Sequence, residues 1–212
     1  MEIIDNRAVL LKVRNPDRIT TVIPKSKVIQ TSATHSDVLV NWGLEEAIVL
    51  KNLRIPIPSP INATYKWPGL YKPFDHQRET SSFLTLHRRA FCFNEQGTGK
   101  TASVIWAADY LMKLGVIRRV LVVCPLSIMQ SAWQDDLFKF AMHRTCSVAH
   151  GTSAQRSKII NAGAEKVIIN TAACLNIDFI EKASNEFGKS TIVVCIDIKK
   201  SKFGLMKKKI KK

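Results

Sequence analysis

A glycine-rich stretch at residues 94–101, NEQGTGKT, constrains the fold of this 212-residue chain more than any other feature of its sequence. The stretch follows a short apolar run at residues 90–93 and precedes residues 100–114, whose apolar side chains recur at the spacing of one helical face. A strand, a glycine-rich loop and a helix in this order form the context in which a loop binds phosphate groups. We therefore expect a helix that begins near Lys100 and ends at Gly115.

Each residue type in this loop suits phosphate binding. Gly97 and Gly99 allow the backbone to bend so that its N–H groups point at phosphate oxygens. The helix N-terminus adds a partial positive charge, while Lys100 adds a full cation and Thr101 offers a hydroxyl group to a magnesium ion. The usual pattern has a further glycine where this chain has Asn94, and the plainer alternative is a glycine-rich turn that only caps a helix. We predict that ATP and Mg²⁺ bind here, through Glu95, Gln96, Gly97, Thr98, Gly99, Lys100 and Thr101, with Lys100 also catalytic.

The rest of the chain after the loop has the pattern of an α/β protein. Apolar runs typical of buried parallel strands occupy residues 120–124, 167–170 and 192–197, and residues 127–140 have helical character. Strands that alternate with helices indicate βαβ units and a mainly parallel sheet. We therefore predict a P-loop domain of the α/β class.

The chain divides into three parts by composition. Residues 1–65 form a small α+β accessory region that ends in a linker with alternating prolines at residues 56–60, because proline at alternate positions excludes a helix. Residues 66–197 form the ATP-binding domain, and residues 198–212 form a basic tail.

Two patterns predict local structure inside the accessory region. The apolar runs at residues 8–13 and 19–23 flank an Asn-Pro-Asp turn signal, so we expect a β-hairpin there. Residues 44–53 have two glutamates where the first turn of a helix favours acidic side chains, and we expect a short helix.

The charge of the chain is strongly positive and unevenly distributed. The formal net charge is +15, and residues 198–212 contain eight lysines and no acidic residue. A basic protein favours a polyanionic partner, most often nucleic acid, although a basic surface without such a partner is the alternative. The tail cannot bury enough apolar area to offset its ordering entropy, so we expect it to be disordered.

Several features predict a cytoplasmic protein. No apolar run approaches the roughly 20 residues that a membrane span needs, and the N-terminus lacks the pattern of a signal peptide. The five cysteines are scattered without the spacing of a zinc site, which fits reduced thiols.

Three further segments carry a resemblance to a known family. Residues 72–77, KPFDHQ, resemble the Q-motif of superfamily 2 helicases, and residues 120–140, VLVVCPLSIMQSAWQDDLFKF, resemble motif Ia of their Swi/Snf-like branch. The proline-rich linker and residues 65–69, YKWPG, resemble most the helicases of this type that bacteriophages encode. The resemblance covers roughly residues 38–197. It implies the first RecA-like lobe of a monomeric motor that hydrolyses ATP while moving along duplex DNA, in the host cytoplasm if a phage encodes it. It also implies that Gln77 reads the adenine edge and that Ser127 and Thr171 contact DNA phosphates.

The chain departs from the helicase pattern at the motif that would complete the chemistry. Asp197 matches the aspartate that is catalytic and holds Mg²⁺, but Ile198 replaces the glutamate that positions the attacking water. We therefore expect an incomplete helicase that carries the first lobe only and is inactive alone. Two explanations stay open: a frameshift after Asp197, or a native basic tail on a non-catalytic module that binds ATP and DNA. A small-molecule kinase would need an acceptor site and a lid, and no pattern supplies either.

Overall fold

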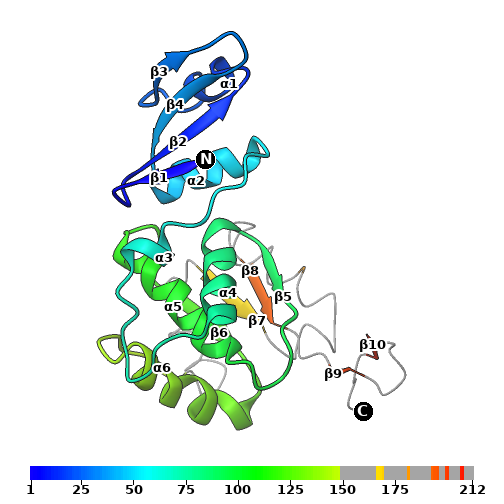
Figure 1. The fold of residues 1–212 in the computed structure, drawn as a ribbon. Helices are drawn as coiled ribbons and strands as arrows, with labels where there is room; N and C mark the ends of the chain where they lie inside the picture. The colour runs from blue at the N-terminus through cyan, green and yellow to red at the C-terminus, as the bar shows by residue number, and fades with distance from the viewer. Residues whose placement is uncertain (149–165, 170–180, 182–191, 196–198, 201–205, 208–212) are drawn as a thin grey trace. The chain divides into compact units, whose positions relative to one another are not determined.

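The computed structural model describes residues 1–148, 166–169, 181, 192–195, 199–200 and 206–207, and every structural statement below concerns these residues. The chain forms two compact units, Met1–Lys66 and Trp67–Lys212 (Figure 1). No helix of the described residues is long and apolar enough to cross a membrane.

The first unit contains a four-stranded antiparallel sheet in the order β1-β2-β4-β3. Its strands are β1 (Glu2–Ile4), β2 (Ala8–Val13), β3 (Lys27–Thr31) and β4 (Ser36–Asn41), and its helices are α1 (Asp17–Thr20), α2 (Leu44–Asn52) and α3 (Ile61–Thr64). Buried residues alternate along the two central strands, because successive side chains of a strand point to opposite faces. The buried set comprises Val9, Leu11, Ser36, Val38 and Val40.

The hairpin predicted between residues 8–13 and 19–23 is wrong, because the second segment begins as helix α1. Ile19 and Ile23 are both buried, and their spacing of four residues places them on one side of a helical turn. The side chain of Asn15 accepts a hydrogen bond from the Asp17 N–H at 3.1 Å, which turns the chain into the helix. The β-branched residues of the segment suggested a strand, but burial of these two isoleucines is better served by the helical turn.

The second unit contains a parallel sheet in the order β5-β8-β7-β6. Its strands are β5 (Ala90–Cys92), β6 (Val120–Val123), β7 (Lys166–Ile169) and β8 (Ile192–Cys195), and its helices are α4 (Asp75–Leu86), α5 (Lys100–Lys113) and α6 (Asp135–Phe140). A 3₁₀ turn (Leu126–Ile128) and a π-helix (Met129–Gln134) precede α6, where the sequence predicted one continuous helix. In the basic tail, β9 (Lys199–Lys200) and β10 (Met206–Lys207) pair in antiparallel fashion.

The prediction of a RecA-like domain with a mainly parallel sheet is wrong for this chain. One of its two four-stranded sheets is antiparallel, and that sheet lies in the first unit. The sequence pattern understated this sheet because its outer strands contribute little to the core. All five residues of β3 and all three residues of β1 are exposed, so neither strand has the apolar alternation of a half-buried strand.

Helix α5 is the most deeply buried element of the second unit. Every residue from Ala102 to Leu111 is buried, and the core cluster joins this helix to α4 and β5 through Leu84, Ala90, Cys92, Val104 and Ala107. Trp106 is fully buried, and its indole N–H donates to the Pro68 carbonyl at 3.0 Å. These contacts fix the middle of α5 in the core of the second unit.

A buried carboxylate fixes the other end of α5. The side chain of Asp109 is 1% exposed, and its oxygens lie 2.8 Å from His143 Nε2, 2.6 Å from Arg144 Nε and 3.3 Å from Lys113 Nζ. Three positively charged or ionisable partners satisfy the buried carboxylate, whose desolvation would otherwise be costly. The cluster ties α5 to the segment that follows α6.

Replacing Asp109 by asparagine should destabilise the second unit by about 1–3 kcal/mol, because charge-assisted hydrogen bonds to a buried group are lost. Urea denaturation of the variant measures this change in the free energy of unfolding. Asp136→Asn is the matched control, since Asp136 pairs with Lys139 at 3.1 Å at the surface, where ion pairs contribute little. Equal stability of the two variants would contradict the role assigned to Asp109.

Candidate phosphate-binding site

The glycine-rich loop connects β5 to α5 and contains two glycines in the left-handed region. Gly97 has φ +84° and Gly99 has φ +76°, a conformation that other residues adopt only with strain. A Cβ atom on Gly99 would also collide with the side-chain amide nitrogen of Gln77, whereas a Cβ atom on Gly97 would meet nothing within 4 Å. Conformation therefore favours glycine at both positions, and a side chain at position 99 would in addition have to displace the end of the Gln77 side chain.

Backbone donors without acceptors are concentrated where the loop enters α5. The first backbone hydrogen bond of the helix runs from the Ser103 N–H to the Gly99 carbonyl at 3.1 Å, and no side chain caps the helix. Among the described residues, no acceptor is found for the N–H groups of Gly97, Gly99, Thr101 and Ala102. Left-handed glycines beside a helix N-terminus form a concave group of donors that favours an anion.

The Lys100 side chain binds back to the start of the loop. Its Nζ donates to the carbonyls of Asn94 and Glu95, each at 3.0 Å. These acceptors are neutral, so an anionic oxygen would be a stronger acceptor for the same ammonium group. The ammonium group is thus held beside the start of the loop.

Asn94, which occupies the position of the missing glycine, anchors the start of the loop. Its amide nitrogen donates to the Thr80 hydroxyl at 2.8 Å, and its amide oxygen accepts from the Cys92 thiol at 3.3 Å. The first of these bonds joins the loop to α4. An asparagine at this position therefore adds a side-chain tether that glycine could not provide.

Gln77 lies against the loop and is 8% exposed. Its Oε1 accepts from the Phe74 N–H at 3.0 Å, and its Nε2 donates to the Thr98 carbonyl at 3.2 Å. Each end of the amide makes one bond to the protein, which leaves one N–H donor and one acceptor lone pair for a further partner. The adenine contact stays a prediction.

The other predicted site residues fall into two groups. The structure brings residues 94–101 and Gln77 together, with Glu95 and Gln96 exposed and Thr101 half-buried. Ser127 is exposed in the 3₁₀ turn after β6, while Thr171 and Asp197 lie outside the described residues. Sequence reasoning missed His76, whose Nε2 lies 3.0 Å from the Thr98 carbonyl; its position next to Gln77 was the available signal.

No cluster of three or more His, Cys, Asp or Glu side chains that could hold a metal ion is found in the described part of the chain. Of the two predicted magnesium ligands, Thr101 lies in the first turn of α5 and Asp197 lies outside the described residues. Burial raises the pKa of both Cys124 and Cys146, so these thiols favour the protonated, unreactive form.

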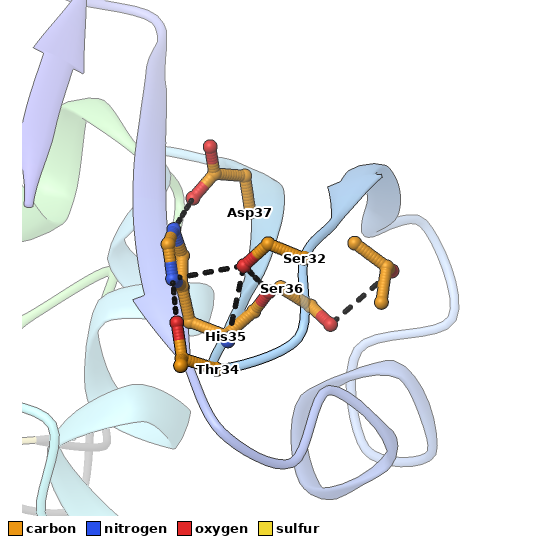
Figure 2. A network of polar contacts seen from close by, with 6 residues as sticks. Ser32, Thr34, His35, Ser36 and Asp37 are labelled. Atoms are coloured by element: carbon orange, nitrogen blue, oxygen red, sulfur yellow. Dashed lines mark hydrogen bonds and ion pairs between the residues drawn. The ribbon is translucent and has the colours of Figure 1, made fainter.

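The turn between β3 and β4 holds a second network of polar side chains, which Figure 2 shows. Ser32 Oγ lies 3.1 Å from His35 Nδ1, and Asp37 Oδ1 lies 3.7 Å from His35 Nε2, a serine–histidine–aspartate sequence of contacts. The serine hydroxyl also donates to the His35 carbonyl at 2.8 Å and accepts from the His35 N–H at 3.2 Å. Because the hydroxyl is committed to its own turn, the network stabilises the hairpin rather than supplying a nucleophile.

A comparison with known protein families concerns the C-terminal third of the chain. A family model described as "Histidine biosynthesis protein" matches residues 142–211, about a third of the chain. The matched segment contains the strands β7 to β10, and most of its other residues lie outside the described ones. It does not include residues 94–101, so it leaves the ligand of the glycine-rich loop open.

This match overturns the resemblance to a Swi/Snf-like helicase. The matched family is of the TIM-barrel type, a closed (βα)₈ barrel, and not a helicase lobe. The predictions of a DNA helicase or translocase, of a truncated bacteriophage protein and of a DNA-binding module are therefore wrong. The DNA contacts assigned to Ser127 and Thr171 depended on that resemblance, and neither the match nor the described residues test them.

Alanine substitutions at the two loop glycines should separate strain from collision. Both variants place a Cβ in the left-handed region, which costs about 1–2 kcal/mol, but only Gly99→Ala also displaces Gln77. We expect Gly99→Ala to lower the thermal midpoint of unfolding more than Gly97→Ala. Identical midpoints would contradict a collision between the Gln77 side chain and a Cβ atom at position 99.

Proposed function

We propose that residues 94–101 bind the phosphate groups of a nucleoside triphosphate, with Mg·ATP as the ligand. The observation that carries this proposal is the set of backbone N–H groups at the start of α5 for which the described residues provide no acceptor. Such groups lose stabilisation unless water or a ligand accepts from them. A phosphate group accepts several of them at once and also takes advantage of the positive end of the helix dipole.

The two charged or polar side chains at the loop suit the same ligand. On binding, Lys100 would exchange the carbonyls of Asn94 and Glu95 for phosphate oxygens, which form shorter and stronger bonds with an ammonium group. Thr101, in the first turn of α5, would offer its hydroxyl to a magnesium ion whose other ligands are phosphate oxygens and water. Magnesium would supply charge neutralisation between the phosphates.

Replacing Lys100 by alanine tests the proposal. We expect the wild-type chain to bind a fluorescent ATP analogue saturably in the presence of Mg²⁺. Lys100→Ala should weaken this binding about 10- to 100-fold, because a charge-assisted contact contributes about 1.5–3 kcal/mol. A fluorescence titration measures both dissociation constants.

Lys139→Ala is the matched control for charge, because Lys139 lies in the same unit on the exposed surface of α6. This variant should bind the analogue as the wild type does. The proposal fails if the wild type shows no saturable binding, or if Lys100→Ala and Lys139→Ala bind equally well.

A second candidate function is a step of histidine biosynthesis, which the family match at residues 142–211 supports. Complementation tests it: the chain should restore growth of at least one histidine-requiring bacterial strain on medium without histidine. Failure to restore any strain blocked in a single step, with the protein present in the cells, would contradict this function. Parallel expression of Lys100→Ala would show whether the loop takes part, because growth should then slow or stop.

A further inference from the structure

The first turn of α4 holds one carbonyl of the glycine-rich loop from two sides. The Thr98 carbonyl oxygen lies 3.0 Å from His76 Nε2 and 3.2 Å from Gln77 Nε2 (segment α4 and the start of α5 in Figure 1). We infer that His76 is a positioning residue of the phosphate site: its hydrogen bond to the Thr98 carbonyl orients the next N–H group toward the ligand. This inference rests on the proposed function, because it assumes that the loop binds phosphate.

Peptide geometry links the Thr98 carbonyl to the N–H group of Gly99. The Thr98 carbonyl and the Gly99 N–H belong to one planar trans peptide group, in which they point in opposite directions. When α4 holds the carbonyl, the N–H of Gly99 must point away from α4. This N–H is one of the donors for which no acceptor is found among the described residues.

The histidine ring is itself held in place. It stacks on the Phe74 ring with a centroid distance of 5.7 Å and an interplanar angle of 11°. A backbone carbonyl can only accept a hydrogen bond, so the bond to Thr98 requires a proton on His76 Nε2. The contact with Phe74 and the bond to the carbonyl together orient the exposed ring of this histidine.

Gln77 also binds the Thr98 carbonyl, but its contacts do not replace those of His76. The glutamine amide lies so close to Gly99 that a Cβ atom there would have to displace it. Its bond to Thr98 is the longer of the two, and its other end is bound to the Phe74 N–H. Loss of His76 should therefore loosen the loop peptide partially rather than release it.

His87, at the opposite end of α4, provides a matched control. Its Nδ1 lies 2.7 Å from the Phe83 carbonyl, and its ring lies against the Phe83 ring at 4.0 Å. It thus combines a bond to a backbone carbonyl with an aromatic contact, as His76 does. Its carbonyl partner, however, belongs to α4 and not to the loop.

The experiment compares wild type, His76→Ala, His76→Gln and His87→Ala as full-length chains with two ligands. The ligands are the fluorescent Mg·ATP analogue and Mg·tripolyphosphate, which has no base or ribose. We expect His76→Ala to bind both ligands about three- to tenfold more weakly, by the same factor, because a loop peptide and not the base is affected. His76→Gln, which keeps a side-chain N–H donor, should recover part of the affinity, and His87→Ala should bind as the wild type does.

Amide hydrogen exchange of residues 94–102 supplies a second measurement that needs no ligand. His76→Ala should exchange faster than wild type in this segment, while His87→Ala should not. Unchanged affinity and unchanged exchange in His76→Ala would overturn the inference, as would a loss confined to the ATP analogue, which would assign His76 to the base. If the wild type binds neither ligand, the proposed function fails, and the exchange data alone decide whether His76 positions the loop.

Discussion

The candidate site depends on the close contact between Gly99 and the first turn of α4. At this point the backbone is left-handed, and the amide of Gln77 occupies the space that a Cβ atom would need. The contact sets where the loop ends and where α5 begins. The donors of the loop are therefore fixed in space by the packing of two helices, and not by the loop sequence alone.

Burial of α5 makes this arrangement rigid. The helix is surrounded by the core over its middle residues, and its two ends are held differently: Asp109 binds three basic side chains near one end, and the loop lies at the other. A site that is already ordered loses less conformational entropy when a ligand binds. If the first turn of α5 binds phosphate as proposed, the deep burial of this helix affects affinity as well as stability.

The sequence predicted the local elements of the second unit better than it predicted the class of the protein. The strands near residues 90, 120, 167 and 192 and helix α5 are found where apolar periodicity placed them, because in buried elements the pattern and the packing agree. The hairpin at residues 19–23 failed because two isoleucines at a spacing of four are compatible with a helical turn. The exposed strands β1 and β3 carried no periodic signal at all.

The residues of the candidate site could also be predicted only in part. Glycines, lysine and threonine in sequence predicted the loop, but the tethers from Asn94 to Thr80 and from His76 to Thr98 join residues 14 and 22 positions apart. Such contacts depend on how α4 packs, which no local pattern contains. The helicase resemblance rested mainly on short motifs, and the two at residues 72–77 and 120–140 lie outside the segment that the family model matches, residues 142–211.

The backbone amides of the loop offer the most direct test of the central claim, that they bind phosphate. Two-dimensional ¹H–¹⁵N spectra of the full-length chain would be recorded while Mg·ATP is added. The account predicts downfield amide proton shifts at Gly97, Gly99, Thr101 and Ala102, with smaller changes in the first unit. If these four amide signals do not shift at a saturating concentration of Mg·ATP, the claim that the loop binds phosphate is contradicted.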